Sequence, residues 1–210
     1  MSEYEIIDIN KTKPGSLPYG LQRFCQDADK YSRDTHLATE NFKTFSILVQ
    51  MGFQNITYES QFRPQDGAFF WINHQHAKQI GKLLRSTIKY LVIKLTTEEE
   101  NSFSIMADHL GKGVTIEELA ISHITADEVT MAEATGLAKL ITKLQVKSFT
   151  LWAAEYVEGA LETFYEKLVG LKNSFLEDVF IGDASKPDGE DRIFFKPLDD
   201  LVQRNKMGRV

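Results

Sequence analysis

The chemistry that this sequence could perform is concentrated in the segment NHQHAKQIGKLLRS, residues 73–86. The segment holds two histidines, two lysines and an arginine, and no acid. His74 and His76 would face the same side of a strand, as a metal-binding pair does, but on a helix they diverge by roughly 200°. The apolar spacing of the segment is helical and Asn73 is a plausible N-cap, so the sequence predicts a helix and no metal site.

Four basic side chains fall within roughly 80° of one another on that helix, and we call them the basic stripe: His74, Lys78, Lys82 and Arg85. No aspartate or glutamate occurs between Gly67 and Thr97, and Lys89 and Lys94 add two more cations to this stretch. A face that is merely solvated usually carries interleaved acids. The basic stripe and Lys89 are therefore the candidate residues for binding a polyanion or an acidic protein, and a solvent-facing stripe is the alternative.

Aromatic residues precede the basic stripe in the run FFW, with Phe69 and Trp71 on one face of a predicted strand. Cations that bind phosphates beside rings that stack on bases are typical of proteins that bind single-stranded nucleic acid. Phe69 and Trp71 are thus the candidate stacking residues of such a site over residues 74–94. If these rings belong to the core, the hypothesis fails.

Other reactive residues form no specific pattern. Cys25 is the only cysteine, so the chain forms no internal disulfide and no cysteine-based zinc cluster. Asp108 and His109 are adjacent but match no metal motif, and neither a nucleophile elbow nor a dinucleotide-binding glycine pattern occurs. We expect no catalytic residue, metal or cofactor. An enzyme site assembled from scattered residues stays open, and its candidates are His74, His76, Asp108 and His109.

The composition is that of a globular protein. The chain has 210 residues, 42% hydrophobic content and a net charge of −6, which argues against coating nucleic acid as a whole. The acidic N-terminus has no apolar signal core, and no run reaches the roughly 18 to 20 apolar residues of a membrane span. We expect a cytoplasmic protein with no membrane contact.

The elements expected in the first half mix helices and strands. Two helices are predicted between Leu21 and Met51, and a β-hairpin around the turn RPQDG within residues 55–72. After the basic helix, branched residues favour a strand over 87–95, although helical spacing from the preceding segment also continues there. The run SFSIMA, residues 102–107, is expected to be a second strand.

The second half is expected to be mainly helical. The runs TIEE (115–118) and TADE (125–128) each fit a capping box at a helix start. Helices are predicted over 125–144 and over about 146–179, with a short helix at the C-terminus. No internal repeat is detected.

These elements predict an α+β fold: a small, mainly antiparallel sheet with packed helices, followed by a long C-terminal helical hairpin. The expected parts are residues 1–113, which contain the sheet, and residues 114–210, which are mainly helical; together they would form one compact unit.

The sequence leaves three function classes open. The first is a non-catalytic interaction or assembly protein that binds another protein, or itself as a homodimer, through its long helices. The alternatives are a nucleic-acid-binding accessory protein and an enzyme.

Overall fold

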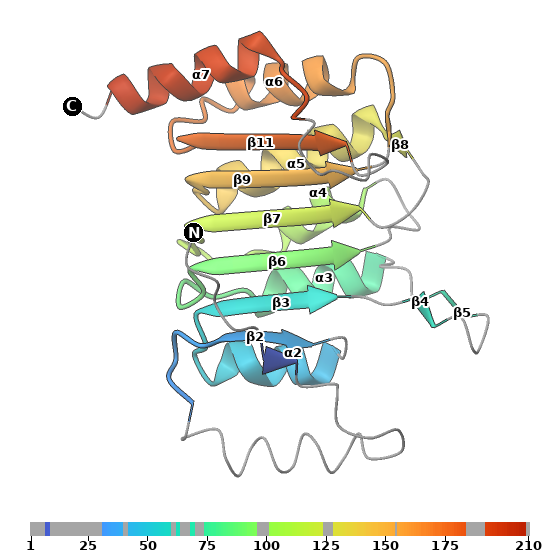
Figure 1. The fold of residues 1–210 in the computed structure, drawn as a ribbon, viewed down its shortest axis with the longest axis vertical. Helices are drawn as coiled ribbons and strands as arrows, with labels where there is room; N and C mark the ends of the chain where they lie inside the picture. The colour runs from blue at the N-terminus through green and yellow to red at the C-terminus, as the bar shows by residue number, and fades with distance from the viewer. Residues whose placement is uncertain are drawn as a thin grey trace.

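The computed structural model describes residues 7–8, 31–39, 42–59, 62–63, 68–69, 74–95, 101–123, 128–153, 155–183 and 192–208. The main sheet is parallel throughout (Figure 1), and its strands are β1 (Ile7–Asp8), β2 (His36–Thr39), β3 (Asn55–Glu59), β6 (Tyr90–Leu95), β7 (Glu118–His123), β9 (Ser148–Ala153) and β11 (Asp178–Asp183). The helices are α2 (Phe42–Gln50), α3 (His74–Leu83), α4 (Ser102–Asp108), α5 (Met131–Lys143), α6 (Ala160–Gly170) and α7 (Lys196–Met207). Two small two-stranded pairs complete the described elements: β4 (Phe62–Arg63) with β5 (Ala68–Phe69), and β8 (Glu128–Val129) with β10 (Glu155–Tyr156).

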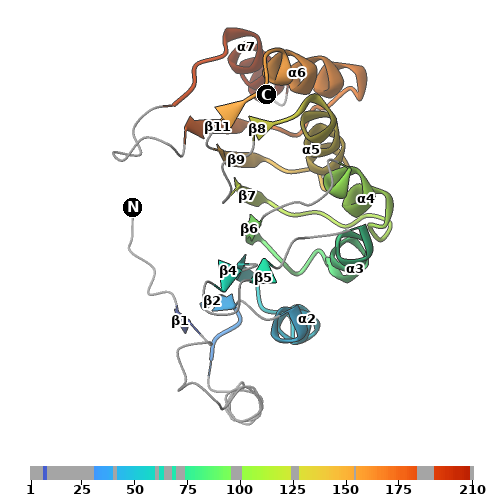
Figure 2. The same ribbon diagram turned by 90° about the vertical axis from the view of Figure 1, so that its right-hand side faces the viewer.

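The strands of the main sheet lie in the order in which they occur along the chain, β1-β2-β3-β6-β7-β9-β11. Parallel β-α-β connections are right-handed, so strands added always on the same side send every connecting helix to the same face. Figure 2 shows this result: α2 to α6 stack along one face of the sheet. The fold is α/β, with the parallel β-α-β units of Rossmann-like proteins. The described strands contain no reversal of order, which is where doubly wound sheets bind cofactors.

A strand-helix unit recurs in the second half of the chain. Strands β6, β7, β9 and β11 begin 28, 30 and 30 residues apart. Each is preceded by a buried apolar residue two positions before the strand, and carries buried residues at its second and fourth positions. In register, these three ladders are Ile88, Ile116, Val146 and Leu176; Leu91, Leu119, Phe149 and Val179; and Ile93, Ile121, Leu151 and Ile181. The helices cover the ladders, so the core lies between the helix layer and one face of the sheet.

Three helices end in the same way. At the C-termini of α2, α5 and α6 one residue has a positive φ: Gly52 (80°), Gln145 (53°) and Lys172 (54°). Each donates its amide to the carbonyl three residues back, and the following amide reaches five residues back, as in a Schellman motif. This turn reverses the chain from the helix layer toward the next strand. Its recurrence supports the repeat seen in the strands.

Helix α7 closes one end of the sheet. It lies beyond β11 in both views (Figures 1 and 2) and buries Leu198, Leu201 and Val202. The Asn205 side chain donates to the Leu176 carbonyl (2.8 Å), and the Arg192 guanidinium donates to the Val179 carbonyl (3.0 Å). These contacts satisfy carbonyls near the exposed edge of β11, which would otherwise be a template for pairing with another chain. The segment from Arg192 to α7 is therefore a cap.

The predicted fold class is wrong. The main sheet is parallel rather than antiparallel, and no C-terminal helical hairpin exists in the described residues, because β7, β9 and β11 lie within the part expected to be helical. The sheet also continues across Gly113, since β6 and β7 pair directly. The one antiparallel pair of named strands that the structure describes is the small hairpin of β4 and β5, which flanks the predicted turn RPQDG.

Individual elements were predicted with mixed success. The second helix before Met51, the basic helix, the strand over 87–95 and a C-terminal helix are confirmed by α2, α3, β6 and α7. The first predicted helix, from Leu21, lies mostly outside the described residues. The run SFSIMA is helix α4 and not a strand: Phe103 and Met106, which are three residues apart, are both buried, and the helix packs against α3 and α5. The run TIEE leads into strand β7, and the run TADE lies almost entirely outside the described residues. The capping box of α5 is formed by Thr130 and Glu133.

Two glycines let neighbouring helices approach closely. A Cβ on Gly81 of α3 would overlap the Met106 carbonyl oxygen of α4, and a Cβ on Gly136 of α5 would lie 2.8 Å from the Ser104 amide nitrogen. Both obstacles are backbone atoms, which cannot move aside as a flexible side chain can. The spacing of α3, α4 and α5 therefore depends on these two glycines.

We expect Gly81→Ala and Gly136→Ala each to lower the free energy of unfolding by about 1–3 kcal/mol, because overpacking outweighs the helix propensity of alanine. Gly170→Ala in α6 is the matched control, since a Cβ there meets nothing within 4 Å. Urea unfolding of the three variants measures the difference. If Gly81→Ala were as stable as Gly170→Ala, the close approach of α3 and α4 would be contradicted.

Candidate functional site

The face of the main sheet opposite the helices is the candidate site, and we call it the helix-free face. No described helix lies on it (Figure 2). The parallel register arranges its side chains in three rows across the strands. The first row is His36, Asn55, Tyr90, Glu118, Ser148 and Asp178; the second is Ala38, Thr57, Val92, Ala120, Thr150 and Phe180; the third is Glu59, Lys94, Ser122, Trp152 and Gly182. Apart from Thr57 and Gly182, all of these residues are half-buried or exposed.

An aromatic platform occupies the carboxyl ends of β9 and β11. The rings of Trp152 and Phe180 lie 4.8 Å apart between centroids at an interplanar angle of 44°. Gly182 makes this packing possible, because a Cβ there would lie 2.5 Å from Trp152 Cε3 and 2.7 Å from Phe180 Cε1. The Tyr156 hydroxyl donates to the Gly182 carbonyl (2.9 Å) and holds this end of β11. The platform offers a half-buried apolar surface.

Two carboxylates stand at the amino ends of β7 and β11, the strands on either side of β9. Glu118 and Asp178 are exposed, and both are in register with Ser148 on the strand between them. Two strand spacings place their backbones roughly 10 Å apart. Burial, and then the Glu118 carboxylate, raise the pKa of Tyr90, which is the first-row neighbour of Glu118. This end of the face is therefore negative.

At the other edge of the sheet, on β2, β3 and β6, the side chains of the helix-free face contact one another. His36 Nε2 lies 2.8 Å from Thr57 Oγ1, and the His36 ring packs edge-on against Tyr90 at 5.3 Å. Burial lowers the pKa of His36. In the third row, the Lys94 ammonium lies 3.4 Å from the Glu59 carboxylate, so these charges offset each other.

The residues of the basic stripe differ in their exposure on α3. His74 and Lys82 are exposed on α3 and Lys78 is half-buried, which agrees with a helix that buries Ala77 and Ile80 instead. Lys89 is exposed in the turn before β6. All of them belong to the helix layer and its turns, not to the helix-free face. Their role in binding a polyanion stays a prediction.

Arg85 has a structural task. Its guanidinium donates to the carbonyls of Lys82 (2.7 Å), Leu83 (3.0 Å) and Leu84 (2.8 Å). These are carbonyls at the C-terminal end of α3, where a cation also complements the helix dipole. Of the candidate stacking residues, Phe69 lies on β5, where only its backbone is described, and Trp71 lies outside the described residues.

The scattered histidines and aspartate are not brought together. His74 is exposed, whereas His76 packs edge-on against Phe42 at 4.6 Å and has its Nε2 3.4 Å from the Tyr58 hydroxyl. Asp108 forms ion pairs with lysines 139 and 143 of α5, at 2.7 and 3.1 Å. His109 Nδ1 bonds to the Ile105 carbonyl (2.9 Å). Across the described ranges, no three histidine, cysteine or acidic side chains gather as a metal site.

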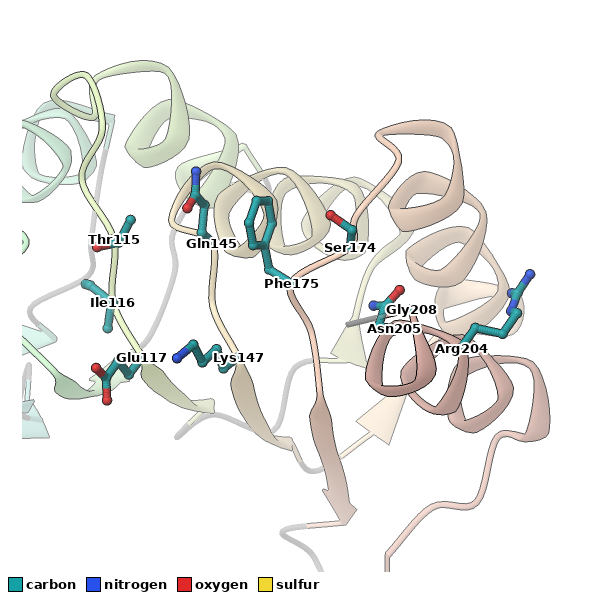
Figure 3. Close-up of a pocket in the computed structure, with 10 residues that line it drawn as sticks. All are labelled: Thr115, Ile116, Glu117, Gln145, Lys147, Ser174, Phe175, Arg204, Asn205 and Gly208. Atoms are coloured by element: carbon teal, nitrogen blue, oxygen red, sulfur yellow. The ribbon is translucent and has the colours of Figure 1, made fainter. Parts of the chain in front are cut away.

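A pocket of about 640 Å³ lies at the amino ends of β7, β9 and β11, beside the end of α7. Its lining comprises Thr115, Ile116, Glu117, Gln145, Lys147, Ser174, Phe175, Arg204, Asn205 and Gly208. In Figure 3, Lys147 points toward Glu117, whereas Arg204 points away from both. The charged groups thus do not converge on one point where a substrate atom could sit, which an acid-base or nucleophilic site requires.

These features define an α/β protein in which strand-helix units stack in chain order along one axis, with the described connecting helices α2 to α6 on one face of a parallel sheet. No protein-family model matches the chain, and comparison with characterised proteins finds no significant match. Among the described helices, none is long and apolar enough to cross a membrane.

Sequence reasoning missed the helix-free face because each strand contributes only two or three residues to it. A signal was present nonetheless. Apolar residues spaced i, i+3 and i+5 recur at Ile88, Ile116, Val146 and Leu176 with intervals of 28 to 30 residues. Aligning on that spacing would have shown four equivalent strands and would have identified the residues between the apolar positions as one surface.

Acidification should destabilise the protein through His76. Burial lowers the pKa of His76, so the folded state favours the neutral ring, while the unfolded chain takes up the proton below about pH 6.5. Stability is therefore present above that pH and falls as the pH drops through it toward the folded pKa. Urea unfolding at pH 7.5 and pH 5.5 should show a smaller loss of stability on acidification in His76→Phe than in the unchanged protein. An unchanged loss in this variant would argue against the buried position of His76.

Gly182→Ala should displace the Trp152 ring, because the new methyl group would occupy the space of Cε3 and Cζ3. We expect a loss of about 1–3 kcal/mol in stability and a shifted Trp152 emission in a Trp71→Phe background. Ser122→Ala is the control on the other side of Trp152, and it removes only a hydroxyl. Identical emission spectra for Gly182→Ala and Ser122→Ala would contradict the platform geometry.

Proposed function

We propose that the chain is a non-catalytic binding protein that uses the helix-free face of its sheet to bind another protein. The observation that carries this proposal is the face itself: three registered rows of half-buried and exposed side chains, with every described connecting helix on the other side. Parallel sheets are usually covered on both faces. Solenoids that leave one sheet face uncovered use it as an extended surface for partners.

The chemistry of the face also supports a protein partner. Mixed polar, aromatic and charged side chains in a continuous surface are typical of protein interfaces, which are enriched in tryptophan, tyrosine and phenylalanine. The face offers one of each in Trp152, Tyr90 and Phe180. Enzyme function has less support, because the described histidines and acids do not converge.

The nucleic-acid hypothesis stays a prediction. Binding of single-stranded nucleic acid rests on the exposed part of the basic stripe, and charge reversal at Lys78 and Lys82 would test it. A homodimer formed through a long helical hairpin has lost its basis, and a dimer would need another surface. We also propose a cytoplasmic setting, because the chain has a single cysteine and the composition of an ordinary globular protein.

The proposal predicts that binders selected against the protein will need the helix-free face. A displayed peptide library is selected on the immobilised full chain, and the affinity of the selected peptides is measured for variants. Ala120→Arg/Thr150→Arg places two bulky cations in the second row and should weaken binding at least about tenfold, which is roughly 1.4 kcal/mol. The matched control is Gln75→Arg/Gln79→Arg on the exposed side of α3, which adds the same charge and should change affinity less than about twofold.

Circular dichroism and thermal unfolding establish that both double variants are folded. Selected peptides whose affinity falls equally in the two variants, or only in the α3 variant, would contradict the proposal.

A further inference from the structure

We infer that the segment bound by the helix-free face is extended and basic, with lysine or arginine placed two residues from an apolar side chain. This inference rests on the proposed function and specifies the partner of the same face. The partner is thus a segment of another protein that the face recognises by its positive charge and by its apolar side chain.

Charge complementarity carries the first half of the inference. Glu118 and Asp178 are exposed on either side of the small Ser148 side chain, so a cation above Ser148 would lie between two carboxylates. Among the described residues, neither carboxylate forms an ion pair. The cation at the edge of β11, Arg192, is paired with Asp199 of α7 (2.7 Å) instead.

The aromatic platform carries the second half. Along β11 the helix-free face presents Asp178, then Phe180, then Gly182 beneath the Trp152 ring. Two residues along an extended chain span about 6.6 Å, both in this strand and in an extended ligand. A ligand whose cation lies above Ser148 would therefore place its next side chain on the same side over Thr150 and Phe180. The remaining cation of the face, Lys94, is offset by Glu59 and lies two strands away from Trp152.

The test uses two fluorescein-labelled peptides of about twelve residues with alternating exposure. The first repeats Lys-Thr-Leu-Thr, and the second has glutamate in place of lysine. Fluorescence anisotropy with the full chain should show at least about tenfold tighter binding of the lysine peptide, and this preference should weaken with salt. Glu118→Lys/Asp178→Lys should reverse the preference, and Trp152→Ala should weaken binding of both peptides.

The control for non-specific attraction is Glu162→Lys/Glu166→Lys on α6. It changes the net charge by the same amount, and both of its positions are exposed on the helix side. The preference for the lysine peptide should survive in this variant. If it is lost as fully as in Glu118→Lys/Asp178→Lys, the attraction is a property of the overall net charge of −6 and the inference is overturned.

The remaining outcomes separate this inference from the proposed function. Equal binding of both peptides, abolished by Ala120→Arg/Thr150→Arg, would overturn the basic partner but leave the face as a binding surface. A selected library that yields no face-dependent binder would overturn both. Two other occupants of the helix-free face would also overturn the inference. If sedimentation shows a dimer that Thr150→Arg dissociates, the occupant is a second copy of the chain. If Trp152 fluorescence in a Trp71→Phe background is shielded from quenching by iodide, the occupant is part of the same chain.

Discussion

The structure depends on apolar side chains that all face one side of a parallel sheet. In each unit a residue before the strand and two within it, such as Ile116, Leu119 and Ile121, insert between the strand and the helix layer and are almost fully buried. Because right-handed connections send every described connecting helix to that side, no helix among the described residues covers the alternate strand positions. Their side chains are free to differ from strand to strand, so carboxylates, rings and small residues can share one surface without loss of core packing.

Much of the local structure could be predicted, and the arrangement could not. Helical spacing located α2, α3 and α7, and branched residues located β6. The error arose where strand and helix patterns follow each other closely. Phe149, Trp152 and Tyr156 have spacings that also fit a helix, and they run directly into the true helical pattern of α6 at Ala160 and Phe164. Gly159 marks the boundary as the N-cap of α6 with φ of 83°, a conformation that a helix interior does not contain.

The class of the sheet was mispredicted for a related reason. Strands buried on both faces read as continuous apolar runs, whereas alternation is typical of antiparallel sheets with one wet face. Here alternation occurs in a parallel sheet, because the described connecting helices α2 to α6 lie on one face. The candidate site was missed because its residues are far apart in the sequence. The basic stripe is local in sequence and was easy to notice, while Glu118, Ser148 and Asp178 become neighbours only once the register is known.

The cap formed by Arg192 and helix α7 lies outside the recurring strand-helix unit, so the number of units can change without changing the cap. A further strand-helix unit of about thirty residues, inserted between β9 and β11, would meet the same apolar ladders on both sides and leave the cap contacts of β11 intact. Each such unit would widen the helix-free face by about 4.8 Å, the spacing between neighbouring strands. The reach of the binding surface can thus be adjusted by whole-module duplication, independently of the chemistry that closes its end.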